Sequence, residues 1–134
     1  MTENNEQICV CVVENDEAVR ISLSRLLRAS GIHVELFASL SDLFDTQRQI
    51  QRGCMLIDLR SLLPGEAAML TQGSREAGSM LSIIAVSDLD EETSRRKARE
   101  LGAQFLLHKP VDGQAPLDAI HWIMDPQDHA VKKR

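Results

Sequence analysis

The 134-residue sequence is poor in aromatic residues, with no tyrosine, one tryptophan and three phenylalanines. Its core must therefore consist mainly of Leu, Ile, Val, Ala and Met. Basic residues are also scarce for a nucleic-acid surface, because such surfaces carry a basic stripe and the formal net charge here is −5. The one basic cluster, at 132–134, is expected to be a frayed tail. We therefore expect no nucleic-acid partner.

Long hydrophobic runs are absent too. No stretch approaches the roughly 18 apolar residues of a membrane span, and the polar start does not resemble a signal peptide. We therefore expect a cytoplasmic chain with no membrane partner and with reduced thiols. Cys9, Cys11 and Cys54 lie in apolar runs, with no histidine or second Cys pair at ligand spacing, and are interpreted as buried small hydrophobes. The four scattered histidines predict no metal site.

Short apolar runs alternate with amphipathic segments along the chain. The runs predict strands at 8–13, 32–37, 54–57, 81–86 and 103–107. Helices are expected after the cap Asp16, after Ser39 or Ser41, from Pro64, over 90–101 and over about 112–124. Connections this short predict an α/β fold, a parallel sheet with helices on both faces. We expect one domain over 8–124, between a disordered start (1–7) and a polar tail (125–134).

Polar residues follow four of the five predicted strands: Glu14 with Asn15, then Asp58, Ser87 and Lys109. Ligands of such sheets gather at the carboxyl ends of the strands, so these side chains are candidates for one site. The Asp58 carboxylate would attack a phosphoryl donor and hold the group as an acyl phosphate. Glu14 and Asn15 would supply oxygens to Mg²⁺, while the Ser87 hydroxyl and the Lys109 ammonium would bind the phosphoryl oxygens.

The segments VVENDEAVR, LIDLR, AVSD and HKP resemble the receiver domains of response regulators, particularly those related to the nitrogen-fixation regulators. This resemblance covers about residues 8–124. It implies a flavodoxin-like, doubly wound sheet of order 2-1-3-4-5 and phosphorylation of Asp58 by a histidine kinase or phosphotransfer protein. It also implies Mg²⁺ held by Glu14, Asn15, Asp58 and the backbone carbonyl of Arg60. A cis peptide bond between Lys109 and Pro110 would aim the lysine.

The sequence departs from the family pattern beside this site. Asn15 stands where the family has a second acid, so Mg²⁺ should bind more weakly than usual. The family's proline falls where Leu62 stands, and Leu62 with Leu63 is interpreted as either a hydrophobic cover or a partner contact. Leu106 replaces the usual switch aromatic, while Phe105 should point to the other sheet face. Neither Arg60 nor Leu89, two residues beyond Asp58 and Ser87, can readily orient water, so we expect slow hydrolysis of an aspartyl phosphate.

Three surfaces are candidates for partners, each with an ordinary solvated or packed face as the alternative. The first helix would present Ala18, Ile21, Ser22 and Arg25 to a kinase or phosphotransfer domain. The fourth helix has a thin stripe to bury, Ser94, Ala98 and Leu101, which suits a mobile switch element. On the last helix Trp122 should point outward beside Ala115 and Ala119, where it would contact a second copy or an unknown effector protein, or be covered by the C-terminal tail.

The sequence therefore predicts a non-enzymatic, stand-alone receiver that signals through protein contacts and lacks an output domain. A fragment of a longer regulator is the alternative for its length. A pseudo-receiver, an interaction module that no longer uses phosphate, is the alternative for its function. An aspartyl phosphohydrolase would want Asp-x-Asp, but position 60 is Arg. A nucleotide- or flavin-binding domain needs a Gly-rich or Ser/Thr-rich phosphate loop after the first strand. The acidic segment Glu14-Asn15-Asp16 stands there instead and would repel phosphate.

Overall fold

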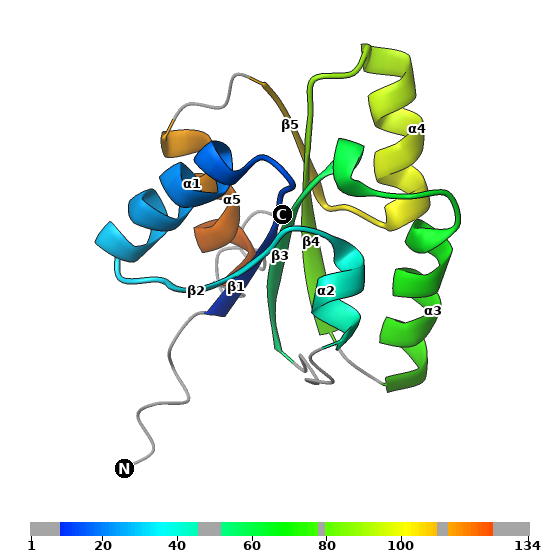
Figure 1. The fold of residues 1–134 in the computed structure, drawn as a ribbon, viewed down its shortest axis with the longest axis horizontal. Coiled ribbons are helices and arrows are strands. Elements are labelled where there is room, and N and C mark those ends of the chain that lie inside the picture. Colours follow the sequence, from blue (N-terminus) through cyan, green and yellow to red (C-terminus); the bar gives the residue numbers. More distant parts are fainter. Residues whose placement is uncertain (1–8, 46–51, 78–79, 110–112, 125–134) are drawn as a thin grey trace, which may run out of the picture.

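The strands form the centre of the molecule, and Figure 1 shows the helices on either side of them. The computed structural model describes residues 9–45, 52–77, 80–109 and 113–124. The predictions for the two termini and for the Lys109–Pro110 peptide bond fall outside these residues. Among the residues described, no helix is both long and apolar enough to cross a bilayer.

Five parallel strands make one sheet, in the order β2-β1-β3-β4-β5. They are β1 (Cys9–Val13), β2 (His33–Phe37), β3 (Arg52–Asp58), β4 (Met80–Ser87) and β5 (Phe105–His108). The predicted fold class and strand order are confirmed. In such an order β2 and β5 are the edge strands, and the carboxyl ends of β1, β3 and β4 lie next to one another.

Helices cover both faces of the sheet. They are α1 (Glu17–Ala29), α2 (Leu40–Asp45), α3 (Glu66–Ala77), α4 (Glu91–Leu101) and α5 (Gln114–Met124), with a 3₁₀ turn η2 (Leu59–Ser61) directly after β3. In Figure 1, α1 and α5 lie on one side of the strands, and α2, α3 and α4 lie on the other. The sheet thus has an α1/α5 face and an α2–α4 face.

Strand alternation divides the apolar residues between two cores. On β3, Cys54 and Leu56 pack with Leu27 of α1 on the α1/α5 face, whereas Met55 and Ile57 belong to the core of the α2–α4 face. Successive residues of a strand point to opposite faces, so a strand with helices on both sides needs an unbroken apolar run. This is why the run from Cys54 to Ile57 reads as it does.

Local chemistry fixes several helix ends as the sequence predicts. The Asp16 carboxylate accepts a hydrogen bond from the Val19 N–H (3.2 Å) at the start of α1, and Asp90 does the same for the Thr93 N–H (2.8 Å) in α4. Gly102 ends α4 with a φ of 79°, in the left-handed region that glycine adopts without strain.

The predicted start of the third helix at Pro64 is wrong. The helix begins at Glu66, because Gly65 has a φ of 88° and interrupts the helical backbone. Instead, the Leu63 N–H donates to Glu66 Oε1 (2.9 Å) and the Glu66 N–H donates to the Leu63 carbonyl (3.0 Å), which together close the turn before the helix.

The predicted outward placement of Trp122 is also wrong. Its ring is half-buried and meets Phe105 edge to face, with ring centroids 5.4 Å apart and planes at 82°. Ala119, expected on the same outer side, is buried against the sheet. The reason is that α5 packs near the edge strand β5, so Phe105 offers the tryptophan a partner that helical periodicity alone does not reveal.

Candidate functional site

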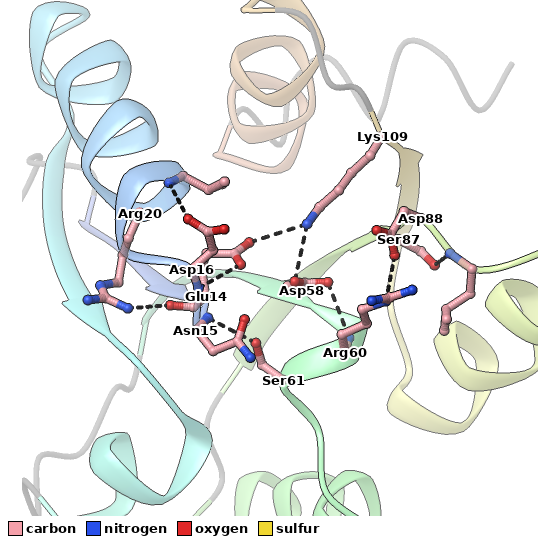
Figure 2. A network of polar contacts seen from close by, with 12 residues as sticks. Glu14, Asn15, Asp16, Arg20, Asp58, Arg60, Ser61, Ser87, Asp88 and Lys109 are labelled. Atoms are coloured by element: carbon pink, nitrogen blue, oxygen red, sulfur yellow. Dashed lines mark hydrogen bonds and ion pairs between the residues drawn. The ribbon is translucent and has the colours of Figure 1, made fainter.

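Residues at the ends of four strands meet along the edge of the sheet that is formed by the carboxyl ends of its strands (Figure 2). Glu14 follows β1, Asp58 ends β3, Ser87 ends β4 and Lys109 follows β5. The strand register brings these ends level, because Asp58 pairs with Val86 and the Lys109 N–H donates to the Ser87 carbonyl (2.8 Å). The sheet therefore carries these distant segments to one place.

Lys109 connects the two carboxylates of this edge. Its Nζ donates a hydrogen bond to Asp58 Oδ2 at 3.2 Å and lies 3.7 Å from Glu14 Oε1. The two acidic side chains are almost wholly buried, at 3% and 2% exposure, whereas 25% of the lysine side chain is exposed. The structure thus brings together three of the residues that the strand-end pattern singles out.

Three hydrogen bonds hold the backbone and side chain of Glu14 in place. Its backbone N–H donates to the Phe37 carbonyl (3.0 Å), its carbonyl accepts from Arg20 (2.7 Å), and its Oε2 accepts from the Asp16 N–H (3.1 Å). Burial raises the pKa of this carboxyl above its ordinary value. The Asp16 hydrogen bond and the Lys109 charge lower it without cancelling the rise, to which the Asp58 charge adds.

Lys109 is charged under all ordinary conditions. Partial burial alone would lower its pKa, but the negative charges of Asp58 and Glu14 outweigh that effect and hold the pKa of Lys109 above its ordinary value. The site therefore places one fixed positive charge against two carboxylates. The ammonium has three N–H donors, so it can also bind the oxygens of an incoming anion.

The second oxygen of Asp58 faces the turn that follows β3. Asp58 Oδ1 accepts a hydrogen bond from the Arg60 N–H (3.2 Å), so the aspartate also caps the 3₁₀ turn η2. Outside the carboxylate, Arg60 Nε pairs with Asp88 Oδ1 at 2.8 Å and joins the loops after β3 and β4 (Figure 2). This pair is half-exposed, at 59% and 41% for its two side chains, and lies where solvent screens it.

The oxygen donors at this edge fit a hard divalent cation. Two carboxylates, Glu14 and Asp58, lie against the same ammonium, so their two formal negative charges face only one positive charge. Asn15 is exposed, with its backbone N–H donating to Ser61 Oγ at 3.2 Å. Its amide adds a neutral oxygen where an acid would add a charge. Magnesium therefore suits the donor types present, with less charge to hold it.

Ser87 is turned toward α4. Its Oγ lies 2.7 Å from Ser94 Oγ and accepts a hydrogen bond from the Leu89 N–H at 3.0 Å, while the whole residue is buried. Ser94 Oγ also donates to the Leu89 carbonyl at 3.2 Å. The hydroxyl predicted to bind phosphoryl oxygens is thus engaged with Ser94 and the start of α4 in this structure.

The other residues at which the sequence departs from the family pattern lie partly in the core and partly on the surface. Leu106 is partly buried on the α2–α4 face and Phe105 on the α1/α5 face, which confirms the alternation expected for β5. Leu62 is partly buried and packs against the core of the α2–α4 face. Leu63 is 63% exposed and is the part of that loop available to a partner.

Two residues of the site escaped the sequence analysis. Asp88 pairs with Arg60, and Ser61 accepts from the Asn15 backbone. Asp88 follows directly on Ser87 at a strand end and could have been found there. Ser61 had no comparable signal, because its partner lies 46 positions away in the sequence.

The family described as “Response regulator receiver domain” matches residues 10–121 of the chain. The chain therefore belongs to this family of two-component signalling. Its members are phosphoacceptor signalling modules rather than conventional enzymes, as the sequence led us to expect, and they partner with histidine kinases and typically bind Mg²⁺.

Two curated relatives are transcriptional regulatory proteins. FixJ of Azorhizobium caulinodans is 31% identical over 116 residues, which are 86% of this chain and 54% of FixJ. TdiR of Thauera aromatica is 31% identical over 120 residues, which are 90% of this chain and 52% of TdiR. The chain thus spans about half the length of these relatives. The expected likeness to nitrogen-fixation regulators is confirmed.

Solved structures agree with this assignment. A response regulator receiver protein from Burkholderia phymatum is 26% identical with a TM-score of 0.70, covering 88% of this chain and 95% of that one. Full-length FixJ from B. japonicum is 25% identical with a TM-score of 0.73, covering 93% of this chain and 61% of that one.

Proposed function

We propose that this receiver accepts a phosphoryl group on Asp58 from the phosphohistidine of a histidine kinase or phosphotransfer protein. The observation that carries the proposal is the contact of Lys109 Nζ with Asp58 Oδ2 at 3.2 Å, beside the buried Glu14. An aspartate, an ammonium and a second acid at one strand-end edge are the groups that the transfer needs.

In the proposed step an Asp58 oxygen attacks phosphorus and the bond from phosphorus to the donor's imidazole nitrogen breaks. The imidazole keeps the electron pair and takes a proton, while Asp58 becomes an acyl phosphate. Lys109 then exchanges its carboxylate contact for the phosphoryl oxygens, where its charge opposes the added negative charge. The Ser87 hydroxyl would rotate from Ser94 to the same oxygens.

Magnesium would be held by Glu14, Asp58, the Asn15 side chain and the backbone carbonyl of Arg60. The ion would neutralise negative charge on the transferring group. With one acid fewer than the family pattern, this set should hold Mg²⁺ weakly.

A small-molecule phosphodonor tests the proposal directly. Incubation of the chain with acetyl phosphate and Mg²⁺ should add one phosphoryl group to the intact mass, and Asp58→Asn should gain none. Asp118→Asn is the matched control, because it changes an exposed carboxylate of α5 that takes no part in the site and should still be labelled. Absence of label at saturating donor and Mg²⁺, in a chain that is folded by circular dichroism, would contradict the proposal.

A pseudo-receiver is the second candidate, and two observations favour it. Asn15 removes a metal charge, and the Ser87 hydroxyl is already bonded to Ser94 and Leu89. In that case the chain would bind its partner equally well with and without phosphodonor. The mass measurement separates the two functions.

We also propose that partners dock beside α1. Its expected docking residues, Ala18, Ile21, Ser22 and Arg25, are exposed. A cavity of about 690 Å³ is lined by Ala18 and Ser22 together with Glu14 and Lys109, so a partner on α1 would lie next to the site. A cytoplasmic location and signalling through an unidentified effector belong to the same proposal. Action without an output domain is tested by the length of the encoding reading frame.

A further inference from the structure

Three side chains of the kinds that bind metals meet near the amino ends of β1 and β2. Asp58 lies at the other end of the strands, where the carboxyl ends meet. Cys9 begins β1 and His33 begins β2, and the parallel register pairs their Cα atoms directly. Glu35 lies two residues further along β2 and therefore on the same face as His33. One ligand atom from each residue lies within 4.8 Å of the other two. The sequence analysis found no such set, because residues 9 and 33 become neighbours only through strand pairing.

The donor types suit a transition-metal ion such as Zn²⁺. Thiolate sulfur, imidazole nitrogen and carboxylate oxygen are the three protein ligands that zinc takes. Tetrahedral zinc with ordinary bond lengths separates its ligand atoms by about 3.3–3.6 Å. His33 Nε2 and Glu35 Oε2 already lie 3.9 Å apart, so small side-chain rotations would close the set. An ordinary ion pair between His33 and Glu35 is the alternative for these two residues.

An ion could reach these ligands from solvent. The His33 side chain is 52% exposed and that of Glu35 is 22% exposed, while Cys9 is partly exposed. The two other cysteines differ, because Cys11 and Cys54 are buried and burial raises the pKa of Cys54 to about 12. Of the three thiols, Cys9 is thus the one that metal and thiol reagents can approach.

We propose that Cys9, His33 and Glu35 bind one Zn²⁺-class ion, with water in the fourth position. Binding would release the Cys9 thiol proton to solvent and tie the edge strand β2 to β1. An ion bound only by the folded chain stabilises it by mass action. This site uses no residue of the Asp58 edge and is independent of phosphoryl transfer.

Cobalt titration tests the site, because a thiolate bound to Co²⁺ gives a charge-transfer band that oxygen ligands cannot give. We expect the band to saturate at one equivalent of Co²⁺ per chain and to disappear on addition of Zn²⁺. Cys9→Ser should abolish the band, and His33→Ala should weaken apparent Co²⁺ affinity at least tenfold. His121→Ala, which removes an exposed histidine of α5, should leave the titration unchanged. A missing band, or equal affinity in the two histidine variants, would refute the site.

Alkylation of Cys9 gives a second test that does not depend on an absorption band. Zn²⁺ should slow the reaction of Cys9 with iodoacetamide, followed by the mass of the peptide that contains it. The protection should be lost in His33→Ala, whose exposed side chain can be removed without disturbing the core. Equal rates with and without Zn²⁺ in the unaltered chain would also refute the site. Phosphoryl labelling of Asp58 should be unaffected by these variants, so a failure of the metal test leaves the proposed function standing.

Discussion

Among the single residues that the structure describes, Glu14 is an acid whose charged form is disfavoured by burial. Burial raises its pKa, so the folded chain binds this proton more tightly than the unfolded chain does. Its contribution therefore favours folding below the ordinary value of about 4.5 and is lost as the pH rises through the raised pKa. At neutral pH the buried charge is a cost that the site retains.

Glu14→Gln should consequently stabilise the fold near neutral pH. The amide keeps an acceptor for the Asp16 N–H and removes the buried charge, so the urea midpoint should rise at pH 7. The gain should shrink at about pH 4, where the carboxyl is protonated in the folded chain. Exposed Glu100→Gln is the matched control and should show neither effect. A lower midpoint at pH 7 would show that the contact with Lys109 outweighs the cost of burial.

Arg60 bears on the lifetime of the proposed phosphoryl group. It stands two residues beyond Asp58 and pairs with Asp88, and neither its side chain nor that of Leu89 has an oxygen that could orient attacking water. We expect the isolated phosphorylated domain to lose its label over minutes or longer. Arg60→Asn should shorten this lifetime severalfold, whereas Arg60→Ala, which breaks the ion pair without adding an amide, should change it less. A lifetime of seconds in the unaltered chain would contradict this expectation.

Among the elements, α4 is joined to the site by its buried polar contact. Ser94, Ala98 and Leu101 are buried, as the thin stripe predicted, and Ser94 hydrogen-bonds the Ser87 hydroxyl. Because this apolar face is small, we expect the helix to depend on the contact between Ser94 and Ser87. Rotation of Ser87 toward Asp58 would break it, which would couple the site to the helix.

Ser94→Ala should cost about 1 kcal/mol of unfolding free energy, the usual net contribution of a neutral hydrogen bond. Hydrogen exchange should quicken in α4 more than in α1, whose face against the sheet includes the buried Leu27. Ser22→Ala, on the exposed side of α1, is the control and should change neither measurement. Uniform loss of protection across all helices would contradict a local link between Ser94 and the site.

At the scale of the whole molecule, one sheet supports two cores and both should melt together. Trp122 is the only tryptophan and packs against Phe105 on the α1/α5 face, so its fluorescence reports on that core. The circular dichroism of the helices reports on both faces. Each strand of the sheet contributes to both layers, which couples them.

Urea unfolding followed by the two signals should therefore give coincident two-state transitions with a free energy of about 5–15 kcal/mol. Trp122→Ala should lower that free energy by about 1–2 kcal/mol, because it removes a half-buried edge-to-face pair. Separate midpoints for fluorescence and circular dichroism would show that the α2–α4 face unfolds independently. The packing of Trp122 against Phe105 also bears on the expected contact with a second copy of the chain. A tryptophan that packs against its own sheet is less available as a dimer contact.

The sequence by itself determined the elements and the edge on which the site lies. Unbroken apolar runs, caps such as Asp16 and the left-handed Gly102 act over a few neighbouring residues, so their outcome is readable from local order. Parallel strands with short connections place all carboxyl ends on one edge, which is why Glu14, Asp58 and Lys109 could be grouped in advance.

Only the tertiary structure decided which side chains touch within that frame. The edge position of β5 gave Trp122 a partner in Phe105, the packing of α4 gave Ser87 a partner in Ser94, and the pairing of β1 with β2 brought Cys9 to His33. Such contacts depend on strand order and on how far a helix overhangs the sheet. The periodicity of a single segment predicts neither of these features, because both arise when separate segments pack against one another.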